Sequence, residues 1–178
     1  MDSDGYLSQL ADIFNGITVN TPSISAIIAI VLAGVLLLAS GFASASEIAF
    51  FSLTPSDRND IDEQNHPSDE KISALLGDSE RLLATILITN NFVNVTIIML
   101  CNFFFMNVFV FHSPLAEFLI LTVILTFLLL LFGEIMPKIY SAQKTLAFCR
   151  FSAPGIYFLE KLFRPIATVL VRSTTFLN

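Results

Sequence analysis

The stretch LILTVILTFLLLLF, residues 119–132, decides the class of this protein, because it holds no charged side chain and few polar ones. Charge is also absent over two other long stretches, between Asp12 and Glu47 and between Arg81 and Glu117. A helix needs about 20 apolar residues to cross the hydrocarbon core of a bilayer. The sequence therefore predicts three membrane-spanning helices, at residues 24–51, 82–110 and 115–136.

The composition of the whole chain supports this interpretation. Of its 178 residues 54% are hydrophobic and 13% are charged, the mean hydropathy is +0.76 and the net charge is -6. Soluble domains carry about 25% charged residues. These values exclude a disordered chain, a disulfide-stapled domain and a basic nucleic-acid-binding protein. Because transmembrane β-strands alternate in polarity, the predicted fold class is an all-α membrane protein in contact with membrane lipids.

The distribution of basic residues predicts an orientation. All nine lysine and arginine residues lie in the predicted loop 54–81 or after the third predicted span. Segments rich in Lys and Arg stay on the cytosolic side of a membrane. We therefore expect an integral protein of the bacterial inner (plasma) membrane, with an extracytoplasmic N-terminal tail at 1–23 and a cytosolic C-terminus. Loop 54–81 is then cytosolic, and its composition predicts short helices at 57–65 and 69–81.

We divide the chain into the N-terminal tail, a three-span transmembrane domain at 24–138 and a C-terminal segment at 139–178. In this last segment charged residues recur beside large apolar ones, and its longest charge-free stretch, 151–159, contains Pro154 and Gly155. Such a pattern is too interrupted for a fourth span. It predicts cytosolic juxtamembrane amphipathic helices that lie in the membrane interface.

Polar side chains recur within the predicted spans. Ser40 and Ser44 are four residues apart in the first span, and Asn90 and Asn94 repeat that spacing in the second. Glu134 lies near the end of the third span. Polar groups inside a membrane are costly and need a partner or a function. Helix packing also accounts for serine and asparagine, and a glutamate at a helix end can reach water, so these ordinary roles stay open.

A shared chemistry distinguishes these side chains, because hydroxyls, amides and a carboxylate all offer the oxygen ligands that suit hard cations such as Mg²⁺. Pro137 adds a backbone oxygen, since in an α-helix it has no N–H for the carbonyl of Gly133. The sequence thus predicts a cation site between three helices. Its expected ligands are Ser40, Ser44, Asn90, Asn94, Gly133 and Glu134.

Three motifs resemble those of a known family. GEIMPK at 133–138 is similar to the G-E-x-x-P-K signature in the transmembrane domain of the CNNM/CorC family. These are magnesium transporters once described as hemolysin-like, with relatives associated with gliding motility. SGFASASE at 40–47 resembles the first-helix motif of the family, and LLATILITNNFVN at 82–94 resembles its second-helix motif. The order of the motifs and the three-span topology also agree with the family.

The resemblance implies a homodimer in which each protomer binds one largely dehydrated Mg²⁺ in an inward-open cavity. The ligands that it implies are Ser40, Ser44, Asn90, Asn94 and Glu134. It further implies alternating access, with export as the expected direction and Na⁺ as a candidate coupling ion. Relatives usually continue into a cytosolic CBS-type domain, which we expect beyond residue 178. The family usually has glycine where Thr89 stands, and a side chain there is expected to narrow the cavity.

A second function class stays open beside transport. It is a non-transporting membrane scaffold, or a regulatory subunit of a secretion or gliding-motility machine. An enzyme is not expected, because the sequence offers no nucleophile–base pair of the kind that covalent catalysis needs. The two histidines, His66 and His112, fall on opposite sides of the membrane in the predicted topology.

Overall fold

The computed structural model describes residues 18–111 and 113–175. Residues 1–17 of the predicted N-terminal tail, His112, and residues 176–178 of the predicted C-terminal segment lie outside the described residues. In chain order the elements are β1 (Thr18–Val19), α2 (Ile24–Phe51), α3 (Pro55–Asp62), α4 (Asp69–Leu76), α5 (Ser79–Val108), β2 (Phe109–Val110), α6 (Pro114–Leu128), the π-helix η1 (Leu129–Ile135), α7 (Met136–Gln143) and α8 (Thr145–Thr175).

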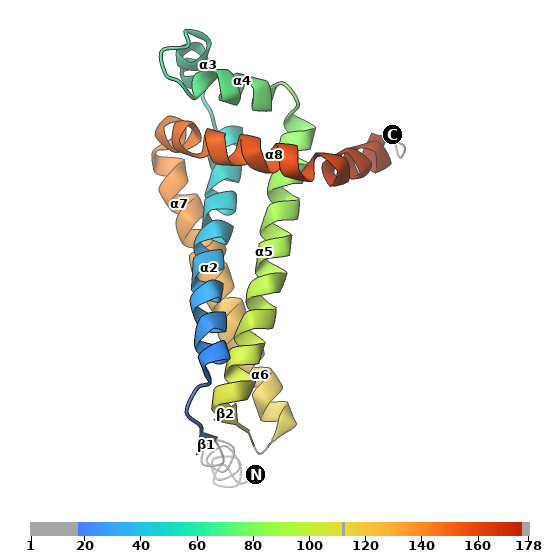
Figure 1. Cartoon of the computed structure of the whole chain (residues 1–178). Coiled ribbons are helices and arrows are strands. Elements are labelled where there is room, and N and C mark those ends of the chain that lie inside the picture. The colour runs from blue at the N-terminus through green and yellow to red at the C-terminus, as the bar shows by residue number, and fades with distance from the viewer. Residues whose placement is uncertain (1–17, 112, 176–178) are drawn as a thin grey trace, which may run out of the picture.

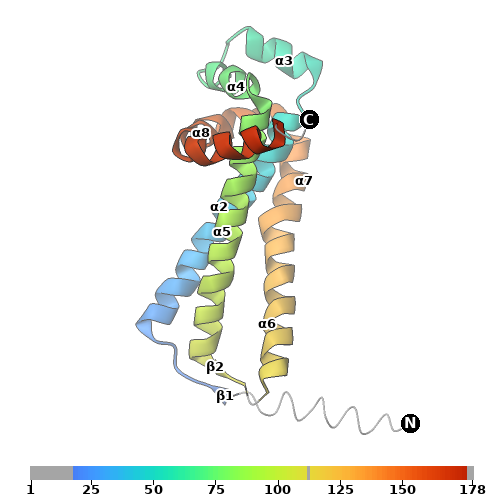
Figure 2. The same cartoon turned by 90° about the vertical axis from the view of Figure 1, so that its right-hand side faces the viewer.

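Three long apolar helical segments form the body of the molecule (Figures 1 and 2). They are α2, α5 and the continuous run α6–η1–α7, and each is long and apolar enough to cross a membrane. The predicted all-α membrane fold with three spanning helices is therefore confirmed. Within the described residues the only strands are β1 and β2, of two residues each, which pair antiparallel at one end of the molecule.

The loop between the first two spans differs from the prediction at its second helix. The predicted helix 57–65 is present as α3, whereas the predicted helix 69–81 ends at Leu76 as α4. Asp78 separates α4 from α5, because its side chain accepts a hydrogen bond from the backbone N–H of Arg81 at 3.1 Å and so caps α5. An Asp at this position favours the start of a new helix over the continuation of the old one.

The predicted juxtamembrane helices are one long helix, and the third span runs further than expected. α7 continues the third span to Gln143, and the chain then turns at Lys144, whose φ and ψ are -135° and 51°. From there α8 crosses the end of the bundle (Figure 1). Pro154 and Pro165 both lie inside α8. Each removes one backbone hydrogen bond, but the helix continues because its buried face packs on the bundle end.

α2 is the central helix of the bundle, since it packs against α5, η1, α7 and α8. Small side chains let the backbones of membrane helices approach closely. Apart from Phe50, the buried residues of α2 are all small: Ala26, Ala29, Ala33, Ser40, Gly41, Ala43, Ser44, Ala45, Ser46 and Ala49. This close packing places Ser40 and Ser44 against the neighbouring spans.

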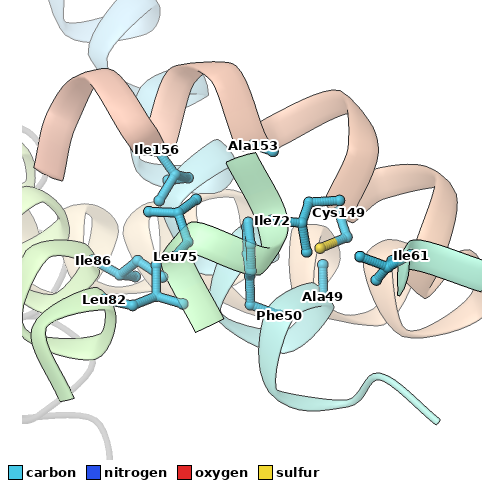
Figure 3. Close-up of a cluster of buried hydrophobic side chains, with 10 residues drawn as sticks. All are labelled: Ala49, Phe50, Ile61, Ile72, Leu75, Leu82, Ile86, Cys149, Ala153 and Ile156. Atoms are coloured by element: carbon cyan, nitrogen blue, oxygen red, sulfur yellow. The ribbon is translucent and has the colours of Figure 1, made fainter. Parts of the chain in front are cut away.

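A core of buried apolar side chains lies at one end of the bundle, where α3, α4 and α8 cover the ends of α2 and α5 (Figure 3). We call this assembly the cap. Its buried side chains are Ala49, Phe50, Ile61, Ile72, Leu75, Leu82, Ile86, Cys149, Ala153 and Ile156. They come from five helices, four of which precede the third span in the sequence and one of which, α8, follows it. The sequence analysis did not predict this core, because its members are scattered along the chain.

An ion pair with a fully buried carboxylate ties α4 to α8 within the cap. Nε and Nη2 of Arg150 donate to Oδ1 and Oδ2 of Asp69, at 2.8 and 3.0 Å. Asp69 has no exposed surface, and this burial by itself raises the pKa of its carboxyl. Hydrogen bonds from Arg150 and from the backbone N–H of His66 outweigh that effect, so the pKa of Asp69 lies below its ordinary value. The pair is therefore ionised at neutral pH and holds two distant segments together.

Candidate metal centre

Four polar side chains of α2 and α5 meet inside the bundle. Oγ of Ser40 lies 2.9 Å from Oδ1 of Asn90 and 2.6 Å from Oδ1 of Asn94, and Oγ of Ser44 lies 3.5 Å from Oδ1 of Asn90. Each serine hydroxyl has one hydrogen to donate. The two hydroxyls therefore cannot donate to all three oxygen contacts at once. The structure thus brings together four of the six predicted ligands in one cluster, which we call the serine–asparagine cluster.

The spacing of these residues explains why they share one face. Side chains four residues apart in a helix lie one turn above each other, so each helix contributes two neighbouring oxygen atoms. Residues outside this spacing face elsewhere. Ser46 donates to the carbonyl oxygen of Phe42 in its own helix at 2.7 Å, and Asn91 is exposed.

Gly133 lies against this cluster from the third span. A Cβ atom at Gly133 would lie 3.1 Å from Oγ of Ser40, so the absence of a side chain lets η1 come this close. The proline argument assumed α-helical pairing, but this segment is a π-helix in which the N–H of Met136 donates to the carbonyl of Leu131, five residues earlier. Gly133 therefore remains a candidate ligand because it lies beside Ser40, and no longer because Pro137 lacks an N–H. Short π-helices occur frequently at functional sites.

Two further contacts hold the third span on α2. A Cβ atom at Gly41 would lie 2.9 Å from Cγ of Pro137, which means that this glycine makes room for the proline ring. One turn further on, Oγ of Ser141 donates to the carbonyl oxygen of Ala45 at 2.7 Å. Gly41 stands beside Ser40 in the first-helix motif, whereas Ser141 has no distinguishing signal in the sequence. The small residues repeated along the first span were the available signal.

Glu134, the remaining predicted ligand, makes a different contact. Its Oε1 lies 3.2 Å from Nζ of Lys138, and the same Nζ lies 3.3 Å from Oε2 of Glu47 on α2. Among the described residues, no hydrogen bond joins Glu134 to the serine–asparagine cluster. The sequence analysis placed Lys138 and Glu47 in motifs without pairing them. The contact between Glu134 and Lys138 was predictable from their four-residue spacing. The contact between Lys138 and Glu47 depends on tertiary packing.

Two threonines of α5 lie close to the cluster in sequence. Oγ1 of Thr89 donates to the carbonyl oxygen of Thr85 at 2.8 Å, so its hydroxyl is satisfied within its own helix. Oγ1 of Thr85 is buried and has no hydrogen-bond partner in the described part of the chain. Thr89, the predicted departure from the family pattern, therefore does not hydrogen-bond to the cluster through its hydroxyl.

Comparison with known proteins identifies the family. The domain described as Cyclin M transmembrane N-terminal domain (CNNM) matches residues 28–178. A UPF0053 protein of Haemophilus influenzae is 31% identical over 134 residues, which cover 75% of this chain and 31% of that protein. UPF0053 protein sll1254 of Synechocystis sp. is 26% identical over 140 residues, which cover 79% of this chain and 39% of that protein. The aligned part of the chain thus spans less than two fifths of either relative. The chain belongs to the CNNM transmembrane domain family.

Proposed function

We propose that this chain is the membrane-spanning part of a divalent-cation transporter, and that its ion is Mg²⁺. The observation that carries the proposal is the meeting of four uncharged oxygen atoms from Ser40, Ser44, Asn90 and Asn94 between two spanning helices. Ionisable groups inside membrane spans mark ion and substrate pathways, and Glu134 is such a group, one residue after Gly133, which lies against Ser40. Membership of the CNNM family supports the same function.

Neighbouring oxygen atoms of the cluster are spaced like those around an octahedral Mg²⁺ ion, a spacing that ordinary O–H···O hydrogen bonds also have. Metal–oxygen distances of about 2.0–2.1 Å in an octahedron place neighbouring oxygen atoms about 2.9 Å apart. The three contacts of the cluster measure 2.6, 2.9 and 3.5 Å. No group of three or more His, Cys, Asp and Glu side chains able to hold a metal occurs among the described residues. The oxygen donors on α2 and α5 therefore favour Mg²⁺ over metals that prefer nitrogen or sulfur.

Glu134 supplies the negative charge in the proposed site. The cluster is neutral, and a dication in a membrane needs a carboxylate to offset part of its charge. Gly133 already lies beside Ser40, so the backbone of its neighbour Glu134 is close to the cluster. In the ion-bound state its carboxylate turns from Lys138 toward the ion, and the backbone oxygen of Gly133 adds to the ligand set.

The proposed transport cycle is alternating access, with export as its direction and Na⁺ as the coupling ion. The cap then faces the cytosol, because segments rich in Lys and Arg stay on that side of a membrane. Eight of the nine basic residues lie in the helices and turns at the cap end of the bundle, and the ninth, Arg172, lies further along α8. In an 18-residue apolar window of each span, 17% of the residues of the third span are buried, against 33% and 39% in the first and second. We propose that a second copy of the chain covers part of this surface in a homodimer.

Titration of the purified chain with MgCl₂ tests the proposed site. We expect saturable binding and Mg²⁺-dependent thermal stabilisation in the wild type, and loss of both in Ser40→Ala and Glu134→Ala. Ser46→Ala is the matched control, because Ser46 is buried in the same helix but donates to Phe42. Unchanged stabilisation of Glu134→Ala by Mg²⁺ would remove that residue from the site.

A scaffold is the second candidate, and one observation favours it. The serine–asparagine cluster is hydrogen-bonded within itself, as in interhelical contacts whose role is packing. Flux of Mg²⁺ into liposomes that contain the protein separates the two candidates. Flux that disappears in Glu134→Ala supports transport, whereas saturable binding without any flux supports a scaffold with a structural ion.

A further inference from the structure

We propose that Lys138 is a tethered counter-ion of the metal centre. In the ion-free protein its ammonium holds the carboxylate of Glu134, and when Glu134 binds the ion the ammonium stays with Glu47. This inference rests on the proposed function and deepens it, because it assigns control of ion affinity to a pair of residues that do not bind the ion themselves.

The first observation is the double contact of one ammonium with two carboxylates. Nζ of Lys138 lies 3.2 Å from Glu134 and 3.3 Å from Glu47. The three side chains carry a net charge of -1, and one of the two negative charges belongs to the expected metal ligand. A cation in the serine–asparagine cluster and the ammonium of Lys138 therefore compete for the same carboxylate.

The second observation is that the side chain of Glu134 is more exposed than those of Lys138 and Glu47. The residue before Lys138, Pro137, packs on Gly41 of α2, and Ser141, one turn later, is hydrogen-bonded to α2. Glu47 lies on that same helix. The side chains of Lys138 and Glu47 are 26% and 28% exposed, but that of Glu134 is 44% exposed. Glu134 is thus the member of the three that can leave.

The third step concerns the charge that remains when Glu134 leaves. An ammonium left without a partner near the membrane is costly. Because Glu47 already contacts Lys138, the ammonium keeps one carboxylate throughout the exchange. Glu47 therefore lowers the free-energy cost of separating Glu134 from Lys138. Lys138, in contrast, raises the free-energy cost of bringing Glu134 to the ion. The two residues should change ion affinity in opposite directions.

Isothermal titration of the purified chain with MgCl₂ tests this arrangement. We expect Lys138→Met to bind Mg²⁺ about two- to five-fold more tightly, the range for an ion pair that is partly exposed. Lys138→Arg keeps the charge and should restore the wild-type affinity. Lys144→Met is the matched control: it removes the same charge from an exposed lysine at the end of α7 that forms none of the ion pairs among the described residues, and should leave the affinity unchanged.

Glu47→Gln supplies the second arm and leaves Lys138 paired with Glu134, so that unchanged or tighter Mg²⁺ binding by this variant alone overturns the counter-ion role even if Lys138→Met does not fold. We expect weaker Mg²⁺ binding in Glu47→Gln, and a smaller effect of the same substitution in a Lys138→Met background. An equal effect in both backgrounds would make Glu47 a direct ligand and overturn the counter-ion role.

The outcomes separate this inference from the function on which it rests. Wild-type protein that binds Mg²⁺ together with a Lys138→Met variant of equal or weaker affinity overturns the counter-ion role and leaves the metal centre intact. Tighter binding by Lys144→Met to the same degree as by Lys138→Met also overturns it, because the effect would then be one of overall charge. Wild-type protein that binds no Mg²⁺ overturns both.

Discussion

The hydroxyl oxygen of Ser40 lies 2.6 Å from the amide oxygen of Asn94, a shorter distance than in the other two contacts of the serine–asparagine cluster. The two residues are 54 positions apart and belong to different spanning helices. Their contact joins α2 to α5 at the point where η1 also approaches. The same contact is thus important for the packing of the bundle and for the proposed metal centre, and the two roles can be separated by experiment.

Ser40→Ala should lower both stability and ion binding. The substitution leaves the amide oxygens of Asn90 and Asn94 without the hydroxyl that they share. Loss of a hydrogen bond to a buried polar group costs about 1–3 kcal/mol. We expect a lower melting temperature in metal-free detergent solution, measured by dye fluorescence because the chain has no tryptophan. An unchanged melting temperature would show that the hydroxyl does not contribute to helix packing.

Gly41→Ala should destabilise the contact between α2 and the third span. The added Cβ would lie 2.9 Å from the ring of Pro137 and 3.4 Å from the carbonyl oxygen of Phe132, so one of the helices must move. Overpacking of this kind costs about 1–3 kcal/mol. Gly34→Ala is the control, since nothing lies within 4 Å of its Cβ position in the same helix. Melting temperatures should fall for Gly41→Ala only.

Asp69→Asn should destabilise the cap. It leaves the guanidinium of Arg150, which is 23% exposed, without its carboxylate, and loss of a hydrogen bond to a charged group costs about 1.5–3 kcal/mol. Protease cleavage between α3 and α5, followed by gel electrophoresis, should be faster in the variant. Equal cleavage rates in the two proteins would mean that the cap is held by its apolar core alone.

The pH dependence of the same pair has a defined sign. Because the pKa of Asp69 is lowered in the folded protein, the pair contributes its full stability above the ordinary carboxyl pKa of about 3.9. The contribution is lost as the pH falls below that value through the folded-state pKa. The difference in melting temperature between wild type and Asp69→Asn should be constant from pH 5 to 8 and shrink below about pH 4.

Cys149 should resist thiol reagents in the folded protein. Burial first, and then the negative charge of Asp69, raise the pKa of its thiol to about 12. The thiolate is the reactive form, so very little of it is present at neutral pH. In a Cys101→Ser background, mass spectrometry should find no maleimide adduct at pH 7 until the protein is unfolded. Rapid labelling of the native protein would show that the cap opens at the contact between α8 and α2.

The three spans were predictable from sequence because hydropathy is a local property. A run such as residues 24–39 must avoid water whatever the rest of the chain does. Of the predicted ligands, the two serines and the two asparagines were recognisable in pairs, because a spacing of four residues places side chains on one helix face. The corresponding prediction for the Gly133 carbonyl assumed α-helical pairing, and the π-helix that replaces it has no equally simple sequence signal.

Hydropathy and helix period are local properties of the chain and were sufficient for the fold class and the spans, and three short motifs were sufficient for the resemblance to the family. Contacts between distant segments are not a local property of the sequence. The pairing of Asp69 with Arg150, 81 positions away, depends on how closely α4 packs against α8, and the placing of Lys138 between Glu47 and Glu134 depends on how closely α2 packs against α7. Helix packing sets those distances, because a side chain's reach of a few ångströms selects its partners only after the backbones have come together.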